Sequence, residues 1–313
     1  MELSTLTLSF EARHSLRAFN TDVSIVASDW RELPSFTRLE SFFAAYEARF
    51  SRFLPSSDVG QFNHRRAECA VVSAELFALI NRCHHFSRIT EGIFNPLILT
   101  SLEAAGYDRS FEHLSKTSRS RHGTRIPPFE VLQIAEVTRE VSLDLPWGID
   151  LGGIGKGHAV DMARALLPDG CGVLIDAGGD IFATGRGPGG APWLVDVADP
   201  HAPGRVIARV ELVDQAVASS WITRRRWRTD AGWSHHLIDP RTGLPADSGL
   251  AGATVIAART DEADVFAKTA VILGAEAGLE FLERMGVDGL LIGADGTQLH
   301  TPGWPGQSNG GIP

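Results

Sequence analysis

The sequence has few of the features that mark secreted, membrane or zinc-binding proteins. Only 3 cysteines occur among 313 residues, they lie far apart, and none belongs to a C-x-x-C pair. The cysteines therefore do not indicate a metal site, and a reducing compartment fits best. The chain lacks the basic start and apolar core of a signal peptide, and no run of about 18 apolar residues occurs anywhere. We therefore expect a cytoplasmic protein that does not insert into a membrane.

Positive charge is also scarce. Lys and Arg number 29 against 38 Asp and Glu, which gives a net charge of −9. This balance argues against non-specific binding of nucleic acid. Hydrophobic residues make up 43% of the chain, enough for a substantial core. We expect a single domain over residues 1–313, with a polar, basic, exposed insertion at residues 109–128 and a frayed Gly/Pro-rich tail at residues 304–313.

The spacing of apolar residues predicts a mixture of strands and helices. Two short strands are expected around Gly178-Gly179 within residues 172–185. Further strands are predicted at Asp22–Ser28, Trp193–Ala198, Val206–Val213, Ala216–Trp221 and Val255–Ala258, and helices at Phe36–Phe50, Ser73–Arg88, Thr260–Leu273 and Ala277–Arg284. Because the elements do not alternate strictly as strand, helix, strand, we expect an α+β fold with mixed sheets and packed helices.

The stretch DLGGIGKGHAVD, at residues 150–161, has four glycines around Lys156 and leads into apolar residues at helical spacing. This pattern predicts the end of a strand, a glycine-rich turn and a helix N-terminus, an arrangement that favours phosphate. It is not a P-loop, because Gly157 follows Lys156, and not a dinucleotide fingerprint, because His158 replaces the third glycine. The alternative is a tight turn with one exposed lysine.

Several stretches set polar residues among glycines in a characteristic order. They are Phe19-Asn20-Thr21, SRFLPSSDVGQFN (residues 51–63), EGIFN (91–95), DLGGIGKGHAVD, DAGGD (176–180), SHHLIDPRTGLP (234–245) and DEADVFAKTAVILG (261–274). Together they resemble the ApbE family, the FAD:protein FMN transferases, from about Ala18 to Leu282. The resemblance implies an ApbE-like, T-fold-related architecture that binds FAD in a cleft. With Mg²⁺, such proteins transfer FMN to a threonine or serine hydroxyl of an acceptor flavoprotein and release AMP.

The resemblance also implies roles for individual residues. Phe53 matches an aromatic side chain that stacks on the isoalloxazine, and Asp264 matches a metal-binding carboxylate. His236 is the best-placed candidate base, although it could instead be a structural histidine that bonds within its turn, and His235 is expected to have no role. The remaining positions are those that line or contact FAD, namely Phe19, Ile93, Phe94, Asn95, Asp150, Lys156 and Leu237, and Gly153, whose backbone carbonyl would lie near the metal.

The sequence departs from the family pattern at four positions. Lys268 stands where a metal-binding threonine is expected, and Thr269 is one residue late, about 100° around the helix. A charged lysine cannot ligate Mg²⁺, and its i, i+4 spacing from Asp264 predicts an ion pair across the metal position. Asn95 replaces an aspartate, and Ser219 and Trp221 replace a threonine and a glycine. We expect Trp221 to narrow the entrance for the acceptor.

Three functions are compatible with these features. The first is an FMN transferase with altered metal use, the second a flavin-binding protein of the same fold that no longer transfers, and the third an FAD pyrophosphatase. The retained Asp150, Lys156, His236 and Asp264 favour the first, whereas Lys268 and Trp221 favour the second.

Overall fold

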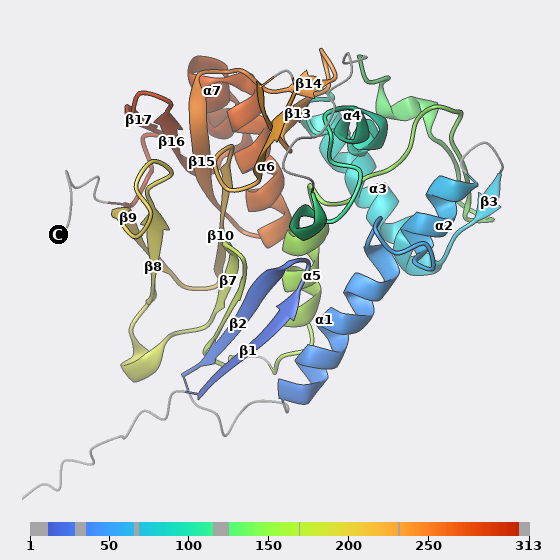
Figure 1. Cartoon of the computed structure of the whole chain (residues 1–313). Helices are drawn as coiled ribbons and strands as arrows, with labels where there is room; N and C mark the ends of the chain where they lie inside the picture. The colour runs from blue at the N-terminus through green and yellow to red at the C-terminus, as the bar shows by residue number, and fades with distance from the viewer. Residues whose placement is uncertain are drawn as a thin grey trace, which may run out of the picture.

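The computed structural model describes residues 12–28, 36–65, 69–114, 125–168, 170–230 and 232–306. Its main feature is an eight-stranded sheet in which every neighbouring pair is antiparallel (Figure 1). In spatial order the strands are β1 (Ala12–Ala18), β2 (Thr21–Ala27), β6 (Val173–Ala177), β7 (Asp180–Thr184), β10 (Gln215–Trp221), β15 (Leu250–Ala257), β16 (Asp288–Gly293) and β17 (Gln298–His300).

Smaller sheets surround the large one. They are the pairs β8 (Trp193–Ala198) with β9 (Val206–Leu212), β11 (Arg226–Thr229) with β12 (Gly232–His235), and β13 (Ile238–Asp239) with β14 (Leu244–Pro245), and a three-stranded sheet of β3 (Ala70–Val71), β5 (Glu140–Ser142) and β4 (Gln133–Ala135). The helices are α1 (Phe36–Phe50), α2 (Asp58–His64), α3 (Ala74–Ile89), α4 (Leu99–Ala104), α5 (Gly155–Arg164), α6 (Thr260–Leu273) and α7 (Ala275–Met285). Among the described residues, no helix combines the length and apolar character that a membrane crossing requires.

The two faces of the large sheet are covered differently (Figure 1). Helices α5 and α6 pack on its central strands, where Ala159 and Ala163 of α5 share a core with Ile175 and Phe182 of the sheet. The β8–β9 hairpin covers the opposite face through a separate apolar cluster that includes Trp193. This layering confirms the α+β fold predicted from the sequence, and it leaves the N-termini of α5 and α6 on the same side of the sheet.

Helices α5 and α6 meet at a joint that places both N-termini. A Cβ added to Gly157 would lie 2.7 Å from the carbonyl oxygen of Thr260, so only glycine permits this approach. The carboxylate of Asp161 accepts hydrogen bonds from the backbone N–H groups of Thr260 and Asp261, at 2.9 and 3.1 Å. It thereby satisfies amides that the start of α6 leaves without an intrahelical partner.

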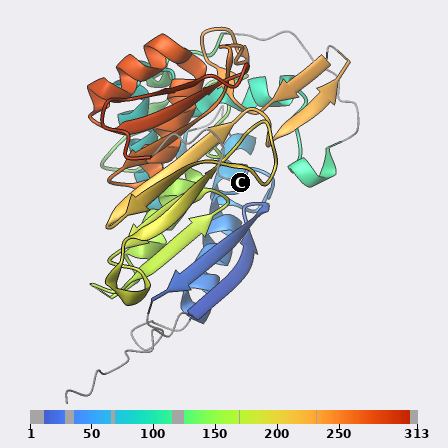
Figure 2. The same ribbon diagram turned by 90° about the vertical axis from the view of Figure 1, so that its left-hand side faces the viewer.

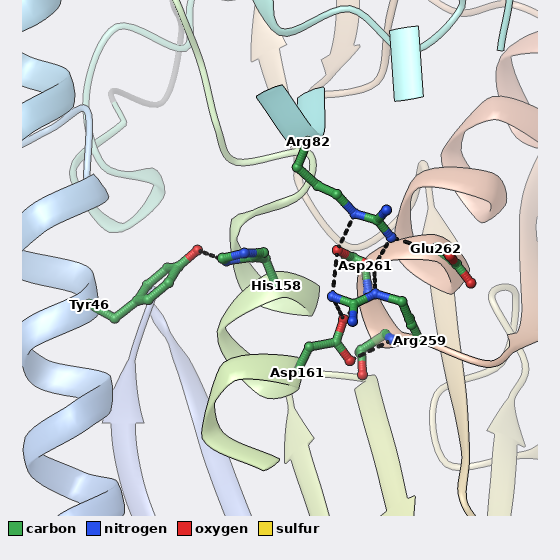
Figure 3. A network of polar contacts seen from close by, with 8 residues as sticks. Tyr46, Arg82, His158, Asp161, Arg259, Asp261 and Glu262 are labelled. Carbon is green, nitrogen blue, oxygen red and sulfur yellow. Dashed lines mark hydrogen bonds and ion pairs between the residues drawn. The ribbon is translucent and has the colours of Figure 1, made fainter. Parts of the chain in front are cut away.

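Charged side chains surround this joint (Figure 3). Arg82 of α3 forms two hydrogen bonds to the Asp261 carboxylate, at 2.8 and 2.9 Å, and Arg259 binds both Asp161 and Asp261. Burial raises the pKa of Asp261, but the two arginines outweigh this effect and hold the pKa at about 2. The network therefore fixes α3, α5 and α6 relative to one another at pH 7.

The structure corrects three predictions about the chain. No strand precedes the glycine-rich turn, because the Asp150 N–H donates to the Pro96 carbonyl rather than to a neighbouring strand. The predicted exposed insertion contains Ile126, which is buried and donates its N–H to Pro240; its central residues, 115–124, lie outside the described residues. Trp304, the first residue of the predicted frayed tail, is buried in the core beneath the β8–β9 hairpin, whereas residues 307–313 of that tail lie outside the described residues.

Trp221 also lies elsewhere than expected. Side chains alternate between the faces of a strand, and Trp221 shares the face of Val217, which is covered by the β8–β9 hairpin. Its ring occupies space left by Gly252, the opposite residue on β15, where an added Cβ would overlap the indole. Trp221 is therefore a core residue, and the prediction that it narrows an acceptor entrance is wrong.

Candidate functional site

A cavity that is partly open to solvent lies where the N-terminus of α5 and the C-terminal half of α6 meet the loops around residues 19, 53, 94 and 236. It brings together segments that are far apart in the chain. All but one of the residues that the sequence analysis proposed as site residues line it: Phe19, Phe53, Ile93, Phe94, Asn95, Asp150, Gly153, Lys156, His236, Leu237 and Lys268. The exception, Asp264, lies immediately behind Lys268.

Aromatic rings form one wall of the cavity. Phe53 and Tyr107 lie with ring centroids 5.7 Å apart, and the guanidinium of Arg52 lies 4.2 Å from the Phe53 centroid and 4.8 Å from that of Tyr107. Arg52 is held there by Asp150, whose Oδ2 is 2.5 Å from Nε, and by the Tyr107 carbonyl, which accepts from Nη2 at 2.8 Å. The wall therefore combines an apolar surface with a fixed, buried cation.

Both carboxylate oxygens of Asp150 have partners within the protein. Besides pairing with Arg52, it accepts a hydrogen bond on Oδ1 from the Gly152 N–H at 2.8 Å, which closes the turn that leads into α5. A Cβ at Gly152 would lie 2.9 Å from this same oxygen, so a larger residue there would displace the Asp150 carboxylate. Asp150 thus shapes the glycine-rich turn and positions Arg52 at the cavity wall.

Lys156, at the start of α5, is directed into the cavity and contacts the carboxylate of Asp180. Asp180 is the last residue of DAGGD and the first of β7, and its side chain is only 1% exposed. The preceding Gly178-Gly179 turn has left-handed φ angles of 70° and 96°, as the sequence predicted for a tight hairpin. Burial lowers the pKa of Lys156 to about 8, and the positive charges of Lys268 and Arg225 act in the same direction.

Lys268 of α6 extends along Gly153, where an added Cβ would lie 3.9 Å from the lysine Cδ and Cε atoms. Its ammonium contacts Oδ1 of Asp264 and donates to the Asp264 carbonyl at 3.2 Å, as the i, i+4 spacing predicted. The second carboxylate oxygen of Asp264 is buried and has no hydrogen-bond partner within the described residues. Thr269 donates its hydroxyl to the Val265 carbonyl at 2.9 Å, so that hydroxyl is engaged within the helix.

The two consecutive histidines have different environments. His235 accepts from the Leu237 N–H through Nδ1 at 3.3 Å, and its Nε2 lies 3.0 Å from the Ala246 carbonyl. His235 therefore holds the turn, and the expectation that it has no role in the chemistry of the site stays a prediction. His236 lines the cavity, and its buried Nδ1 has no partner among the described residues. Burial, reinforced by Arg225 and Lys268, lowers the pKa of His236 well below 6.5, so its imidazole is neutral at pH 7.

Two loops complete the cavity rim. Phe19 and Asn20 form the turn between β1 and β2, with left-handed φ angles of 56° and 55°. The Phe19 N–H donates to Glu47 at 3.0 Å, which ties the turn to α1. On the other loop, Asn95 accepts from the Leu97 N–H at 3.0 Å and donates to the Pro127 carbonyl at 2.9 Å. Both loops are thus held by polar contacts that leave their apolar side chains at the cavity.

The sequence analysis missed several residues of this site. Arg52 and Tyr107 form part of the aromatic wall, Asp180 pairs with Lys156, and Arg225 adds a cation to Arg52, Lys156 and Lys268. Asp180 is the final residue of the DAGGD motif, and its place in that motif is the sequence signal that could have identified it. Arg52 directly precedes Phe53 in a stretch that had also been singled out, but nothing in its pattern separates Arg52 from a solvent-exposed arginine.

Comparison with known proteins gives consistent matches over this chain. The model of the ApbE family matches residues 19–291. The FAD:protein FMN transferase of Treponema pallidum is 31% identical over 251 residues, covering 72% of this chain and 67% of the relative, and that of Salmonella typhimurium is 26% identical over 289 residues, covering 89% and 83%. The crystal structure of the ApbE protein from Thermotoga maritima superimposes with a TM-score of 0.84 at 26% identity, covering 94% of this chain and 97% of that one.

Proposed function

The chain belongs to the ApbE family, and we propose on that premise that it transfers FMN from FAD to a threonine or serine hydroxyl of an acceptor flavoprotein, with release of AMP. The observation that carries this proposal is the composition of one cavity. It presents an aromatic wall at Phe53, buried cations at Lys156 and Lys268, and a neutral imidazole at His236. These groups match the three parts of the reaction, namely a flavin ring, a pyrophosphate and a hydroxyl that must lose its proton.

The flavin is proposed to stack on Phe53, on the ring face that Arg52 does not cover, with Phe19, Ile93, Phe94, Asn95 and Leu237 around it. An offset stack of this kind contributes about 1 kcal/mol beyond the area that it buries. The pyrophosphate is then proposed to lie at the N-terminus of α5, where backbone N–H groups, Lys156 and Arg225 provide positive potential. The glycines of the turn allow the backbone to approach it closely.

The proposed reaction is a phosphoryl transfer. The acceptor oxygen attacks the phosphorus on the FMN side of the pyrophosphate, and a phosphoester bond to the acceptor forms. The bond from that phosphorus to the bridging oxygen breaks, and AMP leaves with this oxygen. The hydroxyl proton passes to the imidazole of His236, which can accept it because burial keeps the ring neutral. The cations stabilise the charge that develops on the leaving phosphate.

The residues present do not fit the Mg²⁺ that the family resemblance implies. Asp264 contacts the Lys268 ammonium, and an ammonium has no lone pair to offer a metal. Within the described part of the chain, no group of three His, Cys, Asp or Glu side chains could hold a metal ion. We therefore propose that Lys268 supplies a fixed positive charge beside the phosphates, with Asp264 and Gly153 positioning it. The lysine provides charge without the octahedral geometry that Mg²⁺ would impose.

The same observation favours a second candidate function. If the ammonium of Lys268 holds the phosphates without orienting them for attack, the protein binds FAD but transfers slowly or not at all. It would then serve as a flavin-binding protein of the same fold. The FAD pyrophosphatase has no separate observation in its favour, since it would use the same His236 and the same cations. A cytoplasmic location stays a prediction from the sequence.

One experiment separates these functions. The purified protein is incubated with FAD and a flavoprotein domain that accepts FMN on threonine, supplied unmodified. AMP is measured by chromatography and the acceptor by mass spectrometry. We expect equal amounts of AMP and of acceptor-linked FMN. AMP with free FMN would instead identify a pyrophosphatase, and bound FAD without AMP a flavin-binding protein.

A further inference from the structure

The two-stranded ribbon of β11 and β12 is joined at both ends to the cavity. Arg225, which lines the cavity, directly precedes β11, and His236 directly follows β12. The strands pair with Arg226 opposite His235 and Arg228 opposite Trp233. In Figure 2 this ribbon stands out from the large sheet rather than packing within it. Whatever binds the outer face of the ribbon is therefore brought next to the proposed base.

The inner face of the ribbon is anchored to the body of the protein. The Trp227 indole is buried, its Nε1 donates to the Ala105 carbonyl at 2.8 Å, and its ring lies 5.2 Å from that of Tyr107. Thr229 and Ser234 on the same face are also buried. The ribbon is thus held against the aromatic wall of the cavity, and its outer face has a fixed orientation.

The outer face carries two arginines and an exposed tryptophan. Trp233 is 59% exposed, and the guanidinium groups of Arg226 and Arg228 lie 4.1 and 5.6 Å from the centroid of its ring. Neither arginine forms an ion pair with a carboxylate in the described residues, whereas the exposed Arg209 on β9 pairs with Asp196 at 2.5 Å. Exposed tryptophan and arginine are the side chains most enriched in the energetic centres of protein interfaces.

The charge of this face indicates the chemistry of its partner. The chain as a whole has a net charge of −9, yet the sequence from Arg226 to His235 contains two arginines and one acidic residue, Asp230 at the turn. A local positive surface on an acidic protein attracts an acidic segment and repels a basic one. The apolar indole beside the arginines adds a surface that a simple anion would leave exposed.

We propose that the outer face of the β11–β12 ribbon binds the acceptor protein, through an acidic segment that flanks the hydroxyl to be modified. This inference rests on the proposed transferase function, since it identifies the surface that guides the acceptor into the cavity. Arg226, Arg228 and Trp233 contact the acceptor but not FAD. The ribbon then determines which hydroxyl reaches His236.

The test uses two synthetic peptides of equal length with one central threonine, one flanked by Asp and Glu and the other by Lys. Binding is measured by calorimetry, and transfer from FAD by mass spectrometry, with the wild type, Arg226→Glu/Arg228→Glu and Trp233→Ala. The matched control is Arg186→Glu/Arg209→Glu, which makes the same charge change at exposed arginines outside the ribbon. FAD affinity of every variant is measured in parallel and shows that each is folded.

We expect the acidic peptide to bind the wild type more tightly than the basic one, with an affinity that falls as salt rises. Both ribbon variants should lose at least about fivefold in affinity for it, while FAD affinity and the control stay unchanged. Equal binding of both peptides, no binding of either, or loss in the control alone overturns the proposal. A dimer that Trp233→Ala dissociates also overturns it, since the occupant would be a second copy. Peptide binding without transfer would support the docking surface and contradict the proposed function.

Discussion

The ammonium of Lys268 contacts Oδ1 of Asp264 one turn earlier on α6, while Oδ2 of the same carboxylate is buried without a hydrogen-bond partner in the described residues. One carboxylate oxygen is therefore neutralised by the protein's own cation, and the other faces no donor. Burial lowers the pKa of Lys268, and the adjacent Asp264 carboxylate opposes that shift. We expect this pair to determine whether the site depends on a metal ion.

We predict that FAD binding by the wild type survives EDTA, because Lys268 provides the charge that a metal would otherwise supply. Lys268→Thr should create a dependence on Mg²⁺, since it frees Asp264 and adds a hydroxyl oxygen. Lys268→Met serves as the control, because it removes the charge without adding a ligand, and it should weaken FAD binding with or without Mg²⁺. Calorimetry with FAD in EDTA and in Mg²⁺ checks all three proteins. A wild type that loses FAD in EDTA contradicts this prediction.

We predict that Lys156 recognises phosphate rather than flavin. Lys156→Met should lose roughly tenfold or more in affinity for FAD, because a charge-assisted hydrogen bond is lost. Riboflavin has no phosphate, so its affinity should change little. Because the pKa of Lys156 is about 8, the wild-type affinity for FAD should also fall as pH rises from 7 to 9, and that of the variant should not. Equal losses for both ligands would exclude this role.

Phe53 should act on the other half of the ligand. Phe53→Ala should weaken FAD and riboflavin alike, by several-fold, because it removes a stacking contact of about 1 kcal/mol together with buried apolar area. Phe53→Tyr keeps the ring and should retain most of the affinity. Fluorescence quenching of riboflavin gives the dissociation constants. If alanine at this position leaves both affinities unchanged, the flavin does not stack here.

We predict an acid sensitivity of stability that originates at His158. Burial raises the pKa of Tyr46 well above 10.0, and its hydroxyl is hydrogen-bonded to Nδ1 of His158 at 2.9 Å (Figure 3). Burial also lowers the pKa of His158 to about 4. The unfolded chain, with a histidine pKa near 6.5, then binds more protons between pH 6.5 and 4, so stability falls as pH falls through this range.

The measurement compares the wild type with His158→Gln by urea unfolding at pH 7.0 and 4.5. Relative to the variant, the wild type should lose about 2–3 kcal/mol of unfolding free energy between these two pH values. Comparing the two proteins cancels the titration of groups that they share. A pH dependence that is the same in both would show that His158 is not the origin.

Much of the architecture could be predicted from the sequence because the local patterns are strong. The helix at Thr260–Leu273 was predicted with the boundaries that the structure has, and the Gly178-Gly179 hairpin follows from two glycines between apolar runs. The ordered motifs also predicted which loops meet at the cavity. The motifs could predict these loops because each loop contains the residues that its own turn requires, whatever the rest of the fold.

Other features could not be predicted because they depend on partners that are distant in sequence. Asp180 gives no local sign that it will meet Lys156, and Arg52 becomes a cavity cation only because Asp150 binds it. The role expected for Trp221 came from its position in a motif. Its side chain enters the core because it lies on the strand face that the β8–β9 hairpin covers, and because Gly252 on the neighbouring strand leaves room for the ring. Ile126 and Trp304 were assigned to exposed segments because their neighbours are polar or rich in Gly and Pro.

The joint at Gly157 and Asp161 has a mechanical consequence. Lys156 is carried by α5 and Lys268 by α6, and the first amides of α6 are held by a carboxylate of α5. The backbones that carry the two lysines are therefore fixed relative to each other, and the ammonium groups are held in place by Asp180 and Asp264. We expect an anion that enters the cavity to meet two ammonium groups at a nearly constant distance from each other, rather than two lysines that move independently. We therefore expect selection among phosphate ligands to depend on the distance between their charges, because only an anion whose charges match the distance between the two ammonium groups can contact both lysines at once.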